Sequence, residues 1–522
     1  GRNLGPADNS FVSGDVQYGV SAPLFSAVSC AIIVPHTRVA CETVEGVGVG
    51  QSVAIRVGGL SAAAQFTPSP ALSYSPPEVD SVQVLRAGVP VASMATAGGD
   101  VLRINGANFG PSQVTLNNNG EAVTVPIQVA VQFGLPAGSS AAGFPTTSNL
   151  RYTALTCTHV LFPHTQINCR VPAGTGAMHA VRVAVAVDNT NFATQWSDMT
   201  VNPVTVSYAA PVITEVTGAG VASGRTSGND LIRIRGRNFG KVTPLRDDTT
   251  WDLLGDGNSQ SSCTNAASNS SGTLLPADLP VVMYGRPTAG ARQFTARFCV
   301  VLSDSDIQCC SAPGTGNMFQ YTVTLDSQTS APLYVPLSSY HPPVVSEYLN
   351  AGGNAPAEAS GTRGGLGVTL AGSNFGDATQ WIDNVFYGKD GGKEYTATGC
   401  VLVTPHTRIR CQTVFGAGSG LSWTVVVDTL QSEAPSTSYA APLVTGFAGA
   451  AVSGAASTLG GQQITLTGTN FGPADGDISV FNGVPSPGTG SMPYDFLEWV
   501  KYGPVTGQEY TATNCTTLSH SS

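Results

Sequence analysis

Apolar and polar residues alternate in short runs along the whole chain, which is the pattern of strands rather than helices. Clear examples are "VLRING" at 101–106 and "LIRIRG" at 231–236, and clusters of Gly, Pro, Asn and Ser separate such runs. No stretch repeats its apolar residues at a period near 3.6, and none approaches the roughly 18 apolar residues of a membrane helix. The pattern predicts an all-β protein with no membrane segment.

One four-part unit recurs along the chain. Ser-Tyr and a nearby proline come first, followed by a strand that ends in Gly-x-Asn-Phe-Gly, a segment that ends in aromatic-Gly, and a hairpin bounded by cysteines. A fixed recurring unit indicates an array of similar domains. Each complete unit has room for about seven short strands at hairpin spacing, which predicts a β-sandwich. We therefore expect five repeats: repeat 1 (1–75, the C-terminal part of a domain), repeat 2 (76–209), repeat 3 (210–341, with a polar insertion near 247–272), repeat 4 (342–440) and repeat 5 (441–522, the N-terminal part of a domain).

The first and last repeats contain only part of the unit. A domain without half of its strands leaves open sheet edges and half a core, which is costly. The sequence thus predicts either a window from a longer array or ends that complement each other between molecules. An unpaired Cys515, at the place that Cys400 holds in repeat 4, favours the window.

The cysteines predict disulfides rather than a metal site or a nucleophile. They come in pairs once per repeat, whereas zinc needs four converging ligands and an active site is rarely copied along an array. The expected pairs are Cys30–Cys41, Cys157–Cys169, Cys299–Cys309 and Cys400–Cys411. The Ile-x-Cys pattern favours Cys309 as the partner of Cys299, whereas counting back from "PGTG" favours Cys310. With the first choice, an outward-pointing Cys310 is free to pair with Cys263 in the insertion.

The segment "CVLVTPHTRIRC" (400–411) illustrates the expected hairpin. Cys400 faces Cys411 and Leu402 faces Ile409, so both sulfurs lie on the apolar face by the period of two. Residues 404–407 form a four-residue turn, and the Pro-His-Thr triplet at its tip is expected to be solvated. Disulfides at this density predict an oxidising compartment, and therefore an extracellular or cell-surface protein.

These motifs together resemble the IPT/TIG family of immunoglobulin-like domains, which occurs in plexins and in large ciliary and algal surface proteins. The resemblance covers nearly the whole chain. It implies an all-β fold of tandem immunoglobulin-like (early-set) β-sandwich domains in a linear array. It also implies scaffolding or binding rather than catalysis, and it identifies no ligand.

Charge and composition restrict the function further. Only 11% of the residues are charged and the net charge is −10, so the chain lacks the basic face that a nucleic-acid partner requires. No carboxylate pair, catalytic triad, phosphate loop or metal cluster can be placed, so we expect no enzyme and no cofactor. A surface with few charges needs another source of solubility, and covalently attached glycans would supply it. The sequons Asn269-Ser-Ser and Asn514-Cys-Thr are the candidate N-glycosylation sites.

The sequence therefore predicts an extracellular structural protein, a glycosylated repeat array that forms a rod or filament by end-to-end or lateral self-association. Surface hairs such as flagellar mastigonemes fit this composition. The alternative is the ectodomain of a cell-surface receptor or adhesin that binds a protein or glycan partner.

Overall fold

The structure is a computed structural model that describes most of the chain. The described residues are 4, 16–20, 25–57, 60–63, 72–118, 121–135, 149–160, 162–187, 196–199, 203–242, 279–288, 290–357, 361–389, 393–432, 436–449, 452, 457–473, 480–481, 484–485, 497–504 and 506–519.

Repeat 4 shows the sandwich most completely. One sheet has the strand order β27-β28-β32-β31, and the other has the order β30-β29-β33-β34 with β35 also paired to β33. All of these pairings are antiparallel. The bounds are β27 (Val344–Asn350), β28 (Gly367–Ser373), β29 (Ile382–Gly388), β30 (Tyr395–Thr396), β31 (Thr398–Thr404), β32 (Arg408–Gln412), β33 (Leu421–Val427), β34 (Leu430–Gln431) and β35 (Ser436–Thr437). This order is that of an immunoglobulin-like sandwich.

Repeats 2 and 3 are built in the same way. Repeat 3 pairs β18-β19-β23-β22 in one sheet and β21-β20-β24-β25, with β26 on β24, in the other. Repeat 2 pairs β14-β15-β9-β7-β8 and β13-β12-β16-β17, and adds the separate hairpin β10-β11. The bounds in repeat 2 are β7 (Glu78–Arg86), β8 (Val89–Val91), β9 (Val101–Ala107), β10 (Gln113–Asn118), β11 (Glu121–Pro126), β12 (Gln128–Leu135), β13 (Asn149–Thr153), β14 (Leu155–His159), β15 (Gln166–Arg170), β16 (His179–Ala186) and β17 (Thr205–Val206). Those in repeat 3 are β18 (Val212–Thr217), β19 (Leu231–Arg237), β20 (Val281–Gly285), β21 (Gln293–Thr295), β22 (Arg297–Ser303), β23 (Asp306–Cys310), β24 (Asn317–Leu325), β25 (Gln328–Thr329) and β26 (Leu333–Ser339).

Repeats 1 and 5 show parts of the same plan. In repeat 1 the strands pair as β2-β1-β5-β6 and β3-β4, and in repeat 5 as β36-β37, β38-β39 and β40-β41. Their bounds are β1 (Val16–Gly19), β2 (Phe25–Ser26), β3 (Val28–Val34), β4 (Arg38–Glu42), β5 (Ser52–Val57), β6 (Leu60–Ala63), β36 (Leu443–Gly449), β37 (Ile464–Thr469), β38 (Val480–Phe481), β39 (Val484–Pro485), β40 (Lys501–Tyr502) and β41 (Tyr510–Thr511).

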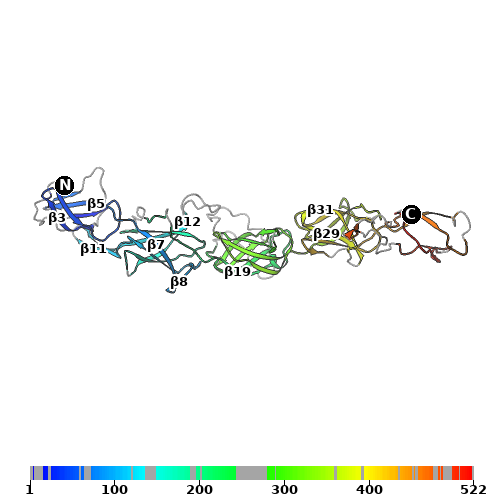
Figure 1. The fold of residues 1–522 in the computed structure, drawn as a ribbon, viewed down its shortest axis with the longest axis horizontal. Coiled ribbons are helices and arrows are strands. Elements are labelled where there is room, and N and C mark those ends of the chain that lie inside the picture. The colour runs from blue at the N-terminus through cyan, green and yellow to red at the C-terminus, as the bar shows by residue number, and fades with distance from the viewer. Residues whose placement is uncertain are drawn as a thin grey trace.

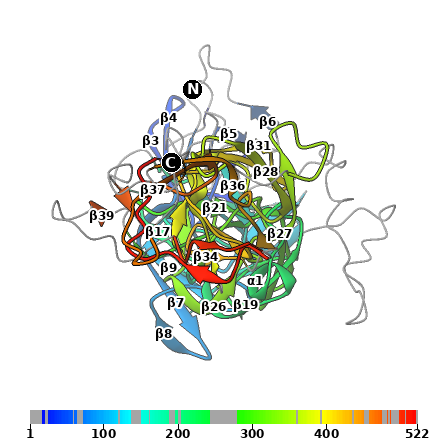
Figure 2. The same ribbon diagram turned by 90° about the vertical axis from the view of Figure 1, so that its right-hand side faces the viewer.

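The repeats follow one another in a row, with the two termini at opposite ends (Figure 1). Seen along this row, the sandwiches overlap, and the hairpin β7-β8 projects to one side (Figure 2). The chain is thus a tandem array of immunoglobulin-like sandwiches, and nearly all of its regular structure is strand. The described helices are the short α1 (Ala219–Ala222) and the single 3-10 turn η4 (Thr379–Trp381). In the described part of the chain, no helix is long and apolar enough to span a membrane.

The Asn-Phe-Gly motif joins each sandwich to its linker. Its asparagines take left-handed φ values between 61° and 65°, and in repeats 2–4 the phenylalanine that follows is a core residue at most 1% exposed. Each asparagine Nδ2 donates to the carbonyl oxygen of the residue before the linker proline. The four contacts are Asn108 to Pro76 (3.0 Å), Asn238 to Ala210 (2.8 Å), Asn374 to Pro342 (3.2 Å) and Asn470 to Ala441 (3.3 Å).

Candidate functional site: the junctions between repeats

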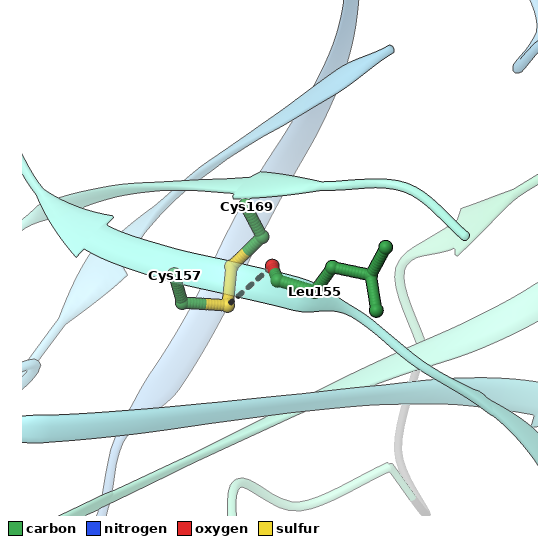
Figure 3. The surroundings of a disulfide bond; sticks show 3 residues. All are labelled: Leu155, Cys157 and Cys169. Carbon is green, nitrogen blue, oxygen red and sulfur yellow. Dashed lines mark hydrogen bonds between the residues drawn. A yellow bond between two sulfur atoms is a disulfide. The ribbon is translucent and has the colours of Figure 1, made fainter. Parts of the chain in front are cut away.

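Strands β31 and β32 form the hairpin bounded by Cys400 and Cys411. The two cysteines are disulfide-bonded with their Cα atoms 4.1 Å apart, and Leu402 pairs with Ile409. Ile409 is fully buried, whereas Val403 on the opposite face is half exposed. The disulfide therefore closes the hairpin on its core side. The same bridge links Cys30 with Cys41 and Cys157 with Cys169, and the latter joins the neighbouring strands β14 and β15 (Figure 3).

The turn of this hairpin lies at residues 404–407, as predicted. The strands pair up to its first residue, because the register shifts after Leu402 and Thr404 pairs with Arg408. His406 makes this possible by taking a left-handed φ of 65°, which lets Thr407 N donate to Thr404 O at 3.2 Å. This hydrogen bond confirms the expected four-residue turn at 404–407.

In repeat 3, Cys299 is bonded to Cys309. Cys310 is also disulfide-bonded, and its expected partner Cys263 lies outside the described residues. Cys310 was expected to point outward, but it is only 3% exposed. It lies between Leu231 of β19 and Arg297 of β22, so strands on both sides cover it.

Removing the Cys400–Cys411 bridge by the double variant Cys400→Ala/Cys411→Ala is expected to destabilise repeat 4 by about 2–3 kcal/mol, because a short loop in the unfolded chain is no longer closed. Hydrogen exchange of the amides in β28 and β32 measures the loss. Val403→Ala, an exposed change in the same hairpin, is the control and should change protection little. Equal protection in both variants would contradict a stabilising role for the bridge.

At least two tyrosines, buried or half buried, form hydrogen bonds to each G-x-G loop or to the residues just before it. The G-x-G loops are defined as residues 46–48, 174–176, 314–316 and 416–418. In repeat 3, Tyr340 Oη donates to Ala312 O at 2.7 Å and lies 2.6 Å from Tyr284 Oη, which accepts from Ala312 N at 2.9 Å. Burial raises the pKa of the Tyr340 hydroxyl, so it remains a neutral donor. A Cβ at Gly314 would collide with Phe294 and Tyr340, which explains the first glycine of the loop. Tyr74, Tyr208 and Tyr439 make the corresponding bonds to the carbonyls of Val44, Pro172 and Val414.

In repeats 2 and 3, a hairpin turn of the following repeat contacts the G-x-G loop. The turn between β24 and β25 consists of Asp326 and Ser327, and the turn between β33 and β34 consists of Asp428 and Thr429. All four residues have positive φ, between 46° and 72°, as a two-residue type I′ turn requires. The aspartate at the head of the turn points into the G-x-G loop of the preceding repeat.

At the junction of repeats 2 and 3, Asp326 forms an ion pair with Arg151 of β13, with 2.7 Å between Oδ2 and Nη1. The side chains are 2% and 8% exposed, so the pair is shielded from water. Gln328 Nε2 adds a bond to Tyr208 O at 3.0 Å. A Cβ at Gly240, the last glycine of Asn-Phe-Gly, would collide with the methyl group of Thr175. The two repeats therefore fit closely at a charged and an apolar contact.

The junction of repeats 3 and 4 has the same arrangement with a different arginine. Arg286, which directly follows β20, contacts Asp428 Oδ1 at 2.7 Å and donates to Asp428 O at 2.7 Å. Thr315 Oγ1 donates to Asp428 Oδ2 at 3.0 Å. A Cβ at Gly376 would lie 2.8 Å from the Thr315 methyl carbon. The aspartate, the threonine and the glycine thus recur at equivalent places in both junctions.

A second ion pair fixes the junction of repeats 3 and 4. Arg292 binds Asp377 through two parallel hydrogen bonds of 3.0 and 2.8 Å, and its guanidinium lies 4.6 Å from the ring centre of Trp381. Such a bidentate bond is stronger and more directional than a single one. The hydrogen bonds from Arg292 hold the pKa of Asp377 below its usual value of 3.8.

The lowered pKa of Asp377 predicts an acid-dependent junction. Docking stabilised by the ionised carboxylate is complete above about pH 4, the usual carboxyl pKa, and is lost as the pH falls through the lowered pKa. The distance between fluorophores on repeats 3 and 4 is therefore expected to become broadly distributed at low pH. Asp377→Asn should broaden it already at neutral pH and remove this step from the titration. An unchanged titration in that variant would contradict the assignment.

At the junction of repeats 1 and 2 the G-x-G loop makes an apolar contact. Val47 occupies the middle of the G-x-G loop, is 3% exposed, and would collide with a Cβ at Gly110. It belongs to one continuous cluster with Val114 and Leu116 of β10. The hairpin β10-β11 therefore extends the core of repeat 2 across the junction.

The tips of the cysteine hairpins also lie at the junctions, which the sequence did not indicate. His406 Nδ1 is 2.9 Å from Thr226 Oγ1 of the preceding repeat, and Asp304 Oδ1 accepts from Thr96 Oγ1 at 2.5 Å. His164 Nε2 lies 3.6 Å from Glu45 Oε2. Burial lowers the pKa of His406. The expectation of a solvated tip is confirmed for the exposed Pro405 and Thr407, whereas His406 is half buried because it contacts the preceding repeat.

The glycosylation candidates are only partly described. Asn514 is exposed in an irregular segment, and the neighbouring Cys515 is half buried and carries a free thiol. Asn269 lies outside the described residues. Among the described residues, no three His, Cys, Asp or Glu side chains are grouped so that they could hold a metal ion.

No family model and no curated protein matches the sequence. Among solved structures, the Escherichia coli adhesin FdeC shares 12% identity over 70% of this chain and 100% of its own, with a TM-score of 0.17. The bacterial integrin-binding protein invasin shares 10% over 86% and 80%, with a TM-score of 0.19, and an S-layer protein shares 10% over 90% and 55%, with a TM-score of 0.14. TM-scores this low carry no argument about function, so the fold assignment rests on the strand order described above.

Proposed function

We propose that the chain is part of an extracellular structural protein of the IPT/TIG type, whose repeats are the domains of a stiff rod or filament. The observation that carries the proposal is the specific docking at three consecutive junctions. An aspartate-headed turn, a hairpin tip and the last glycine of Asn-Phe-Gly meet the preceding repeat at the two junctions within residues 76–440. An ion pair that is shielded from water between two repeats, as Asp326–Arg151 is, resists a change of angle at the junction, because breaking it leaves a buried charge without its partner.

Two further features support an extracellular role. Disulfides persist in oxidising compartments, and the described residues contain four complete ones. The exposed Asn514 and the sequon at Asn269 would carry glycans that keep a weakly charged surface soluble. In this proposal, end-to-end or lateral self-association extends the rod into a filament such as a surface hair.

Negative-stain electron microscopy of the native material tests this function. Long fibrils of uniform width are expected, with a subunit period set by the length of one repeat. Isolated short rods would instead favour a receptor or adhesin ectodomain. Bent particles whose domains take variable angles to one another would contradict the stiff array. Intact-mass measurement tests the glycans, because a mass equal to the 53.3 kDa polypeptide would exclude them on this chain.

A further inference from the structure

The G-x-G loop of repeat 4 has the features of the two loops that receive an aspartate. Gly416 lies against Tyr395 and Tyr439, as Gly314 lies against Phe294 and Tyr340. Gly418 has a positive φ of 122°, and the corresponding glycines of repeats 2 and 3 also have positive φ values, of 99° and 96°. The backbone of this loop is therefore preformed by its own repeat.

A cation is also in place beside this loop. Lys389 directly follows the aromatic-Gly end of β29, just as Arg286 directly follows that of β20. A Cβ at Gly418 would lie 3.7 Å from Lys389 Cε, and a Cβ at Gly316 would lie 3.1 Å from Arg286 Nη2. Both cationic side chains thus extend over the second glycine of their loop.

The loop differs from its two counterparts in what covers it. Gly176 and Gly316 are buried by the following repeat, whereas Ala417 and Gly418 are half exposed. Among the described residues, no carboxylate forms an ion pair with the Lys389 ammonium. The nearby Glu394 accepts a hydrogen bond from the backbone N of Lys389 instead, at 2.6 Å.

We infer that Lys389 and the loop 416–418 form a third socket, which binds the aspartate-headed type I′ hairpin turn of another domain of this kind. The partner is defined by its chemistry: an aspartate followed by a second residue of positive φ, carried on a two-strand hairpin. Lys389 neutralises the carboxylate, as Arg286 neutralises Asp428, and the open loop leaves room for it. The inference rests on the proposed array and names the contact by which repeat 4 would hold a further domain.

The test uses the full 522-residue chain and a disulfide-cyclised peptide that contains the turn from Val426 to Gln431. The peptide is first shown by NMR to hold the type I′ turn. The lysines of the chain are Lys241, Lys389, Lys393 and Lys501, so reductive ¹³C-dimethylation, which keeps their charge, gives few and well-separated signals. Titration with the peptide is expected to move the Lys389 signal and to leave those of Lys241 and Lys501 in place.

Three variants make the test specific. A peptide with asparagine in place of Asp428 should bind at least tenfold more weakly, since a charge-assisted contact is lost. Lys389→Glu in the chain should abolish binding, whereas Lys393→Glu, an equal charge change on a neighbouring exposed lysine, should leave most of it. Ala417→Thr supplies the hydroxyl that Thr315 uses at Asp428 and should tighten binding severalfold.

The inference is overturned if the folded peptide causes no shift at millimolar concentration, or if the asparagine peptide binds equally well. Equal movement of all lysine signals would also overturn it, because it would indicate unspecific charge attraction. These outcomes are separate from the proposed function, since fibrils can be seen by microscopy whether or not the peptide binds.

Discussion

Replacing Asp326 with alanine is expected to weaken the junction of repeats 2 and 3 by about 3–5 kcal/mol, the cost of leaving one member of a buried ion pair without its partner. Arg151 is 8% exposed and would keep its charge in a site that the following repeat still covers. The chain can avoid this penalty only by opening the junction to water. We therefore expect the variant to lose the fixed angle between the two repeats before either sandwich unfolds.

The interrepeat distance measured by fluorescence energy transfer, together with hydrogen exchange of β13 and β24, separates opening from unfolding. Asp428→Ala is the matched comparison, because Asp428 and Arg286 are 18% and 23% exposed and water can solvate the remaining arginine in part. Its effect should be smaller. The double variant Arg151→Met/Asp326→Leu, which replaces the pair by apolar groups, should recover much of the loss. Equal effects of the two single variants would contradict the role assigned to burial.

The sandwiches themselves were largely predictable from the sequence. Alternation at a period of two and the repeated Gly-x-Asn-Phe-Gly unit depend on local chemistry, and they led to the correct fold class. The spacing of the cysteines set the facing pairs in each hairpin. The turn at 404–407 was also predicted, but nothing in the triplet Pro-His-Thr shows that His406 takes a positive φ or that Thr404 pairs with Arg408.

The junctions were not predictable, because their residues are far apart in the sequence and come from unequal positions. Arg151 precedes the core tyrosine of β13, whereas Arg286 follows the end of β20, so no alignment of the repeats brings the two arginines together. One signal was present. Asp326 and Asp428 directly follow an apolar strand, and aspartate is one of the residues favoured at the first position of a type I′ hairpin turn. That signal marks the turn but not the loop that receives it.

The first glycine of Gly-x-Asn-Phe-Gly should be among the least replaceable residues of each sandwich. Gly372 pairs with Val345 at the point where β27 shifts its register, and a Cβ there would collide with the carbonyl oxygen of Val344 and lie 2.8 Å from Phe375 Cζ. The same clash with a backbone carbonyl occurs in the other described copies, at Gly106, Gly236 and Gly468. The bulge therefore requires a residue without a side chain.

Gly372→Ala is expected to destabilise repeat 4 by about 3 kcal/mol, the upper end of the range for overpacking, because a backbone carbonyl in a sheet cannot move aside as a flexible side chain can. Hydrogen exchange of β28 and β32 reports the loss for this repeat alone, which matters because an array does not unfold in one step. Gly446→Ala is the control: Gly446 follows the equivalent bulge in β36, has an ordinary φ and has no atom within 4 Å of its would-be Cβ. It should change protection in repeat 5 by less than about 0.5 kcal/mol. Similar losses from both changes would mean that glycine is needed for backbone freedom rather than for the close approach of the two strands.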